Sequence, residues 1–142
     1  RITPDEVMRH ARILAADSME GRLINTPGSA KARAYLLREF EAAGLQRVGA
    51  EWGHPFQRLN LRDSSHTPGV NVVGVVRGRV RPEQYIVVTA HYDHVGVRNG
   101  EIFNGADDNA SGTSALLAIA KRVAAAPLQH SVLFVAFDGE EG

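Results

Sequence analysis

The chain contains no cysteine. Disulfide bonds and thiolate metal sites are therefore excluded, so a metal ion would have to be held by histidine, aspartate or glutamate. The redox compartment stays open, because a cysteine-free chain tolerates any compartment. No apolar run approaches the ~20 residues of a membrane-spanning helix, and no signal peptide is recognisable.

Net charge is absent as well. The 16 lysines and arginines balance the 16 aspartates and glutamates, so nothing favours a nucleic acid or an anionic membrane as a partner, and we expect neither. The 142 residues, 44% of them apolar, suffice for one globular domain with a core. The chain starts at Arg1 rather than methionine, which fits a leader that was removed or left out.

Apolar periodicity predicts three helices, over residues 3–16, 29–43 and 111–125. Thr3 is the expected N-cap of the first helix, with Pro4 at its first position and Glu6 completing a capping box. Gly44 is the expected stop of the second helix.

Short β-branched runs predict strands over residues 70–76, 85–90 and 132–137, and residues 56–61 a short edge strand. The near-continuous apolar runs indicate burial on both faces of a sheet. Because the 111–125 helix separates the runs at 85–90 and 132–137, these two strands are predicted to be parallel, as in a βαβ unit.

Three clusters of metal-ligating side chains stand next to these elements. They are His91-Tyr92-Asp93, Asp107-Asp108 and Glu140-Glu141. The first and last directly follow predicted parallel strands, and the middle one precedes a helix that starts at the same sheet edge. We therefore expect all three to converge, although up to 50 residues separate them in sequence.

Crowded carboxylates repel one another unless protons or a metal neutralise them. Zinc accepts imidazole and carboxylate ligands, and one aspartate can bridge two metal ions. Asp93 is placed to orient His91 through its second ring nitrogen. In the Glu-Glu pair, one carboxylate can bind metal while its neighbour accepts a proton from water.

Each cluster has a plainer interpretation when taken alone. His-x-Asp is common in surface loops, Asp-Asp-Asn-Ala-Ser is suited to capping a helix, and Glu-Glu is commonly solvated charge. Taken singly, the first and third clusters favour that interpretation. Their shared sheet edge favours a metal site.

Longer motifs around these clusters resemble the M28 family of co-catalytic zinc peptidases. They are His91-Tyr92-Asp93-His94-Val95-Gly96, the stretch from Asn104 to Gly112, and Val135 to Gly142. Glu20-Gly21-Arg22, Thr26-Pro27-Gly28 and Gly44-Leu45 are similar to the family's lead-in segment. The resemblance therefore covers nearly the whole chain.

The resemblance implies a role for each matching position. His91 and Glu141 would be ligands of one zinc ion, and Asp107 would bridge two. Glu140 would be the general base, and Asp93 the partner that orients His91. The family also implies that the peptide bond between Asp107 and Asp108 is strained and typically cis. His94 is expected to serve loop structure or a contact at the rim of the site.

Family members supply an Asp and a His to the second zinc from downstream of the Glu-Glu pair. Residues 1–142 are therefore expected to be the N-terminal part of a single zinc peptidase domain, holding at most one zinc well. The implied fold is an α/β, zinc-exopeptidase-like sandwich with helices on a mostly parallel mixed sheet. Truncation would expose apolar sheet surface, through which copies of the chain could associate as a homo-oligomer.

The function expected of the full-length protein is removal of N-terminal residues from peptide substrates at a dinuclear zinc site. The alternatives are carboxypeptidase or aminoacyl cyclase activity on the same fold, an inactive truncated scaffold, and a binding domain without activity. Export to the periplasm or the extracellular space is expected from the resemblance alone.

Overall fold

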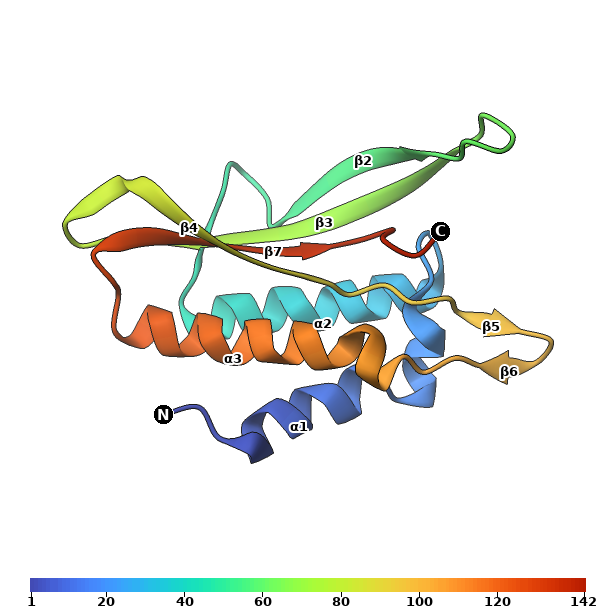
Figure 1. Ribbon diagram of the computed structural model, residues 1–142, viewed down its shortest axis with the longest axis horizontal. Coiled ribbons are helices and arrows are strands. Elements are labelled where there is room, and N and C mark those ends of the chain that lie inside the picture. Colours follow the sequence, from blue (N-terminus) through green and yellow to red (C-terminus); the bar gives the residue numbers. More distant parts are fainter.

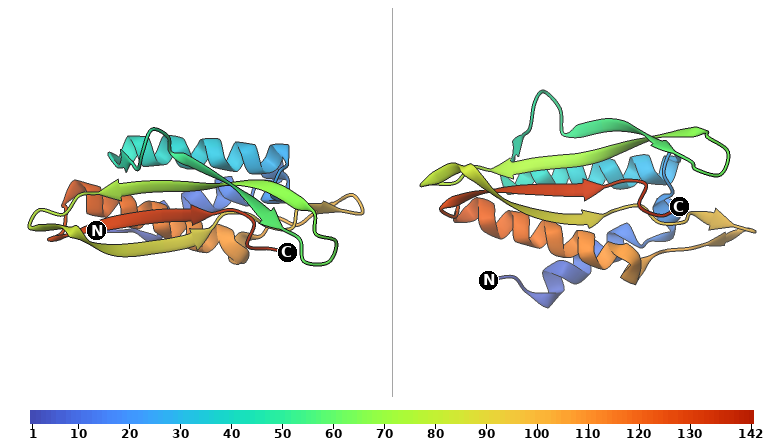
Figure 2. Two further views of the ribbon diagram at one scale, coloured as in Figure 1. Left: turned by 90° about the horizontal axis from the view of Figure 1, so that it is seen from above. Right: turned by 45° about the horizontal axis from the view of Figure 1, so that its top comes forward.

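In the computed structural model, which describes residues 1–142, three α-helices lie on one face of a mixed β-sheet (Figure 1). They are α1 (Pro4–Leu14), α2 (Pro27–Ala43) and α3 (Ser111–Ala125), with short irregular segments η1 (Asp17–Arg22) and η2 (Ala106–Ala110). Helices α2 and α3 pack against the sheet, and α1 packs on α3 farther from it (Figure 2). None of the helices combines the length and the apolar character needed to cross a bilayer.

The ends of the helices follow the predicted capping residues. Thr3 Oγ1 accepts a hydrogen bond from the backbone N–H of Glu6 at 3.2 Å, and Gly44 ends α2 in the left-handed conformation. Helix α3 has the predicted bounds, whereas α2 starts two residues earlier than predicted. The earlier start has a capping cause, because Thr26 Oγ1 accepts from the N–H of Ser29.

The main sheet has five strands in the order β1-β3-β7-β4, with β2 also paired to β3. The strands are β1 (Gln46–Arg47), β2 (Gly53–Leu59), β3 (His66–Val76), β4 (Arg81–His91) and β7 (His130–Phe137). A separate hairpin, β5 (Val97–Arg98) and β6 (Glu101–Ile102), projects beyond the body of the molecule (Figure 1). Its Asn99-Gly100 turn is a strong hairpin signal that the strand prediction overlooked.

The parallel pairing of β4 with β7 is confirmed, with Ala90 opposite Ala136 and His91 opposite Phe137. The expectation of a mostly parallel sheet is wrong, because β1 and β2 pair with β3, and β3 with β7, in antiparallel fashion. The cause is the connections. A six-residue loop joins β2 to β3, and a four-residue loop joins β3 to β4, so the chain reverses direction at each. Because β7 is parallel to β4, it is antiparallel to β3.

Burial on both faces holds for the central strand but not for β4. Phe134 and Val135 of β7, which are adjacent and point to opposite faces, are both buried, whereas Tyr85, Ile86 and Val87 of β4 are about half exposed. Strand β4 is at the edge of the sheet, and the helices cover only one face. The prediction overlooked that an apolar run can lie on an open edge.

The core lies between the sheet and α2 and α3, and continues to α1. Phe40 and Leu36 from α2, Leu116 from α3 and Phe134 from β7 are almost fully buried there. This core fixes the position of α3 relative to β4 and β7. It thereby determines where the segments at the carboxyl edge of the two parallel strands meet.

Candidate metal centre

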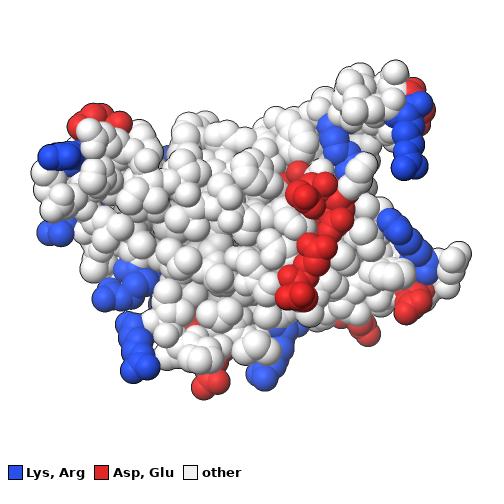
Figure 3. All heavy atoms as spheres, in the orientation of Figure 1, with Lys and Arg blue, Asp and Glu red and all other residues white.

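The three predicted clusters converge at the carboxyl ends of β4 and β7. Strand β4 ends at His91, and Glu140 and Glu141 follow shortly after the end of the adjacent β7. Segment η2 brings Asp108 to the same place at the start of α3. Acidic side chains gather there in one strip on the molecular surface (Figure 3).

His91 stands at the centre of the group with both ring nitrogens facing carboxylates. Its Nε2 lies 3.1 Å from Asp108 Oδ1 and 3.7 Å from Glu140 Oε2. Its Nδ1 lies 3.3 Å from Oδ1 of the fully buried Asp93 and 3.2 Å from the Asp93 carbonyl oxygen. Thr113 Oγ1 donates to the carbonyl of His91 at 2.8 Å and ties it to α3. The imidazole is thus oriented through its Nδ1 side, with Nε2 facing the place where a metal ion would bind.

Asp93 contacts two parts of the group at once. Its Oδ2 accepts a hydrogen bond from the backbone N–H of Glu141 at 3.0 Å, while Oδ1 makes no aligned hydrogen bond. This unpaired, buried oxygen beside Nδ1 of His91 fits the carboxylate that orients a metal-binding histidine. The predicted contact between Asp93 and His91 is therefore present.

The middle cluster differs from the prediction by one residue. Asp108, not Asp107, forms the group with His91 and Glu141, in which the ligand atoms all lie within 4.8 Å of one another. The cis peptide bond joins Asp108 to Asn109 rather than Asp107 to Asp108. The physical reason is local: the irregular backbone of η2 turns the Asp108 side chain toward His91, and Asp107 is not part of the group.

The two glutamates take different positions. Glu140 is 59% exposed and lies beside the Nε2 side of the His91 ring. The Glu141 side chain is only 21% exposed, and its Oε1 lies 3.2 Å from Nδ1 of His94. Partial burial raises the pKa of Glu141, and the neighbouring Asp108 carboxylate raises it further, against the opposing effect of His94. The carboxylates of Asp108 and Glu141 therefore repel each other unless a cation lies between them.

The donor set fits zinc. One imidazole nitrogen and two carboxylates, all close enough to share one ion, are a usual zinc ligand combination. A bound divalent cation would also relieve the repulsion between Asp108 and Glu141. His91, Asp108 and Glu141 are therefore the residues that would hold the ion.

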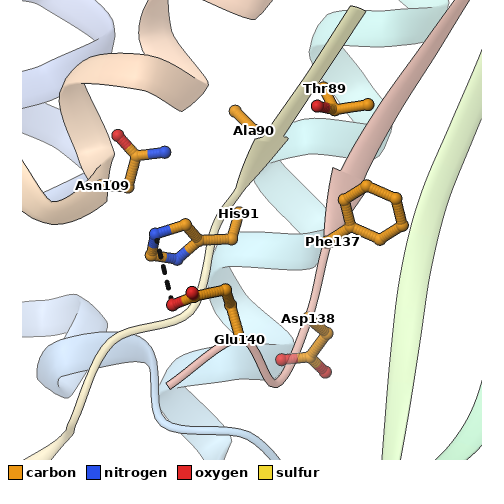
Figure 4. Close-up of a pocket in the computed structure, with 7 residues that line it drawn as sticks. All are labelled: Thr89, Ala90, His91, Asn109, Phe137, Asp138 and Glu140. Carbon is orange, nitrogen blue, oxygen red and sulfur yellow. Dashed lines mark ion pairs between the residues drawn. The ribbon is translucent and has the colours of Figure 1, made fainter. Parts of the chain in front are cut away.

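A cavity of about 420 Å³ adjoins the group (Figure 4). It is lined by Thr89, Ala90, His91, Asn109, Phe137, Asp138 and Glu140. The His91 ring and the Glu140 carboxylate face each other on its wall, while Phe137 and Ala90 give it an apolar side (Figure 4). The cavity can therefore receive an organic group next to the candidate ligands.

Two arginines that the sequence analysis did not single out hold the same region. Arg58 of β2 donates to the carbonyl of Glu141 at 2.6 Å. Arg22 is fully buried and donates to carbonyls of the segments that carry His91 and Asp108. Only the Glu20-Gly21-Arg22 motif hinted at Arg22. No sequence pattern marked Arg58.

The sequence profile of peptidase family M28 matches residues 71–142, which contain every residue of the candidate centre. The chain belongs to peptidase family M28. The resemblance seen in the motifs is thereby confirmed, and the match begins within β3 of the M28 fold.

Individual proteins agree with this assignment. The chain is 32% identical over 84 residues, 58% of its length, to aminopeptidase YwaD of Bacillus subtilis, and it covers 17% of that protein. It resembles the structure of Fimbriiglobus ruber glutaminyl cyclase with a TM-score of 0.80 and 22% identity, covering 99% of this chain and 46% of the cyclase. It also resembles the structure of a Zn-dependent exopeptidase from Parabacteroides distasonis, with a TM-score of 0.75 and 21% identity, covering 98% of this chain and 47% of the exopeptidase.

These structural similarities concern the fold, and they confirm an α/β architecture of the zinc exopeptidase and glutaminyl cyclase kind. The chain spans between 17% and 38% of the length of the curated relatives that it matches. It spans about half the length of the two solved structures.

Proposed function

We propose that this M28 chain carries part of the active site of a zinc exopeptidase that removes N-terminal residues from peptides. The observation that carries the proposal is the group of His91, Asp108 and Glu141, whose ligand atoms lie within 4.8 Å of one another. Membership of family M28 and the similarity to an aminopeptidase support it. The donor chemistry and the similarity to a Zn-dependent exopeptidase support zinc as the metal.

In this proposal each residue has a separate task. Bound zinc supplies a Lewis acid that polarises a carbonyl group and makes a water molecule more acidic. Glu140 accepts the proton of the attacking water and passes it to the leaving amine, because its carboxylate is exposed beside the ligand group. Asp93 keeps Nδ1 of His91 protonated and Nε2 directed outward. The adjacent cavity receives a side chain of the peptide.

A dinuclear site is the finer form of the proposal. Asp108 has two carboxylate oxygens and is the most exposed of the three candidate ligands, so it is suited to bridge two ions. The resemblance predicts an Asp and a His for the second ion, from outside residues 1–142. Zinc analysis separates the hypotheses: one tightly bound zinc in this chain fits the proposal, and none would favour an inactive scaffold.

The role of Glu140 is tested with Glu140→Gln in the full-length protein. Hydrolysis of an aminoacyl anilide should fall about 10²- to 10⁴-fold, the usual contribution of general base catalysis, while the zinc content stays unchanged. Glu101→Gln in the β5–β6 hairpin is the matched control and should leave the rate unchanged. Near-normal turnover of Glu140→Gln would refute the assigned role.

The second candidate function is cyclisation of N-terminal glutamine, which the similarity to a glutaminyl cyclase structure favours. Both reactions act on the amino end of a peptide and need a polarised carbonyl. Two peptides that differ only in leucine or glutamine at the first position distinguish them. Release of free leucine supports the peptidase, and release of ammonia from the glutamine peptide supports the cyclase. Carboxypeptidase activity would instead shorten both peptides from the other end.

Self-association is proposed through β4. Its apolar residues Tyr85, Ile86 and Val87 are about half exposed on an edge strand, and zero net charge offers no general repulsion between copies. Light scattering should find a dimer of this chain and a monomer for Ile86→Lys. A wild-type monomer at high concentration would contradict this.

Export also remains a proposal from the resemblance, which fractionation of producing cells would test.

A further inference from the structure

Arg22 is the largest side chain that is fully buried, and its guanidinium donates only to backbone carbonyls. Its Nε donates to the carbonyl of Tyr92 at 2.7 Å, and one terminal nitrogen donates to the carbonyl of Leu14. The same nitrogen donates to the carbonyl of Asn104 at 2.8 Å, and the other to that of Gly105 at 3.0 Å. Four of its five N–H groups are thereby used, and no carboxylate lies in direct contact.

Three of the four carbonyls that Arg22 binds belong to the two segments that carry the candidate ligands, and the fourth, that of Leu14, lies at the end of α1. Tyr92 stands between His91 and Asp93, so its carbonyl fixes the backbone on both sides. Asn104 and Gly105 directly precede η2, which carries Asp108. Neither Tyr92 nor Asn104 and Gly105 lie in a regular helix or strand. The N–H of Tyr92 donates to the carbonyl of Phe137 at 2.9 Å, and that of Ala110 to the carbonyl of Gly105 at 3.0 Å, but neither bond joins the one segment to the other.

The backbone of the Glu20–Arg22 turn docks onto the same region. The carbonyl of Arg22 accepts from the N–H of His94 at 3.2 Å, and that of Gly21 accepts from the N–H of Gly96 at 3.1 Å. Gly21 has a φ of +68°, and a Cβ there would lie 2.5 Å from the carbonyl oxygen of Gly96. The turn is therefore in close contact with the segment after β4, and the Arg22 side chain extends this contact inward.

The charge of Arg22 is compatible with this position. Burial lowers its pKa to about 10, while the negative charges of Asp93 and Asp108 act in the opposite direction, so the guanidinium stays charged at neutral pH. A lysine at this position would keep a positive charge. Its single ammonium nitrogen could not bind four carbonyls that lie in different directions.

We propose that Arg22 is a positioning residue that sets the distance between the His91 segment and the Asp108 segment, and so preorganises the metal centre before an ion binds. It touches neither substrate nor metal. The inference rests on the proposed metal site, and it assigns to the Glu20-Gly21-Arg22 motif a task that the ligand set alone does not explain.

The test uses this chain with Arg22→Lys and Arg22→Met, and Leu36→Ala as a control that destabilises the core of α2 away from the site. Zinc affinity is measured by competition with a chromogenic chelator. Amide hydrogen exchange is measured on the metal-free proteins. We expect Arg22→Lys and Arg22→Met to bind zinc about 10- to 100-fold more weakly, the usual cost of losing a supporting residue of a metal site. Exchange should become faster in residues 91–96 and 104–109, and the control should keep wild-type affinity.

Three results would overturn the inference. The first is wild-type zinc affinity in Arg22→Lys, which would show that the positive charge, and not the geometry of the guanidinium, supports the site. The second is an equal loss of affinity in Leu36→Ala, which would indicate general destabilisation. The third is unchanged exchange in both segments. If the wild-type chain binds no zinc, the proposed function fails, and the exchange comparison on metal-free protein still decides the role of Arg22.

Discussion

Replacing each aspartate of the Asp107-Asp108 pair by asparagine separates two adjacent, chemically identical side chains. The structure places Asp108 Oδ1 3.1 Å from Nε2 of His91 and leaves Asp107 outside the ligand group. Asp108→Asn should therefore weaken zinc binding strongly, and Asp107→Asn should have almost no effect. The resemblance to the family implied Asp107 as the ligand instead.

The magnitudes follow from the geometry. Removing a residue that only supports a metal ligand lowers metal affinity about 10- to 100-fold. Removing a ligand itself should therefore lower zinc affinity at least about 100-fold, or ~2.7 kcal/mol. Without metal the effect has the opposite sign. Asp108 and Glu141 carboxylate oxygens at most 4.8 Å apart repel by about 1 kcal/mol in a water-like dielectric and about 3.5 kcal/mol at an effective dielectric of 20. Because the Asp108 side chain is 62% exposed, the lower value applies.

The assay is a pair of measurements on each variant. Chelator competition gives zinc affinity, and urea unfolding with chelator present gives the free energy of unfolding of the metal-free chain. Asp108→Asn should bind zinc at least about 100-fold more weakly and be up to ~1 kcal/mol more stable without metal, a gain that salt reduces. If Asp107→Asn instead produced the large loss of affinity, the assignment of Asp108 as the ligand would be refuted.

Two further predictions concern the helices and the turn before the site. Burial lowers the pKa of His10, which contacts Tyr35, below its ordinary value of 6.5. The stability that neutral His10 provides is therefore fully present above pH 6.5. It is lost as the pH falls below 6.5, by up to about 1.4 kcal/mol per pH unit. Urea unfolding at several pH values should show this loss in the wild-type chain and a smaller one in His10→Gln; identical pH profiles would contradict it. Gly21→Ala should cost about 1–3 kcal/mol more than Gly44→Ala, because both glycines have positive φ but only at Gly21 would a Cβ clash with backbone. Equal shifts in melting temperature would contradict this.

The helices and the parallel strand pair could be predicted because their signals are local or follow from connection length. Thr3 and Gly44 mark helix ends through their own hydrogen-bonding and conformational properties. The long crossover through α3 returns the chain to the same edge of the sheet, so β4 and β7 are expected to be parallel. The antiparallel partners of β3 and the exposure of Tyr85 were not predictable in this way, because they depend on which strands lie at the edge.

The predicted clusters meet in the structure, with Asp108 in the place expected for Asp107, and this difference has a physical origin. A motif such as Gly-Ala-Asp-Asp-Asn-Ala-Ser-Gly specifies that a carboxylate lies near the start of a helix. In a regular strand the alternation of side chains would decide which one points inward. Segment η2 has no such period, since Asp108 and Asn109 leave helical geometry, with ψ values of 94° and 43°. Which of two adjacent aspartates faces His91 then depends on tertiary contacts.

The same irregularity explains why the centre needs arginines to which the sequence assigned no role. His91, Asp108 and Glu141 lie at or beyond the ends of regular elements, where backbone carbonyls lack partners within a helix or sheet. In the structure those carbonyls are bound from outside: Thr113 binds the carbonyl of His91, Arg22 that of Tyr92, and Arg58 that of Glu141. Two of the three candidate ligands, Asp108 and Glu141, are acidic and repel each other, so a loosely held site would open in the absence of metal. Anchors that bind backbone rather than carboxylates hold the segments together and leave the charges of Asp108 and Glu141 free for a cation.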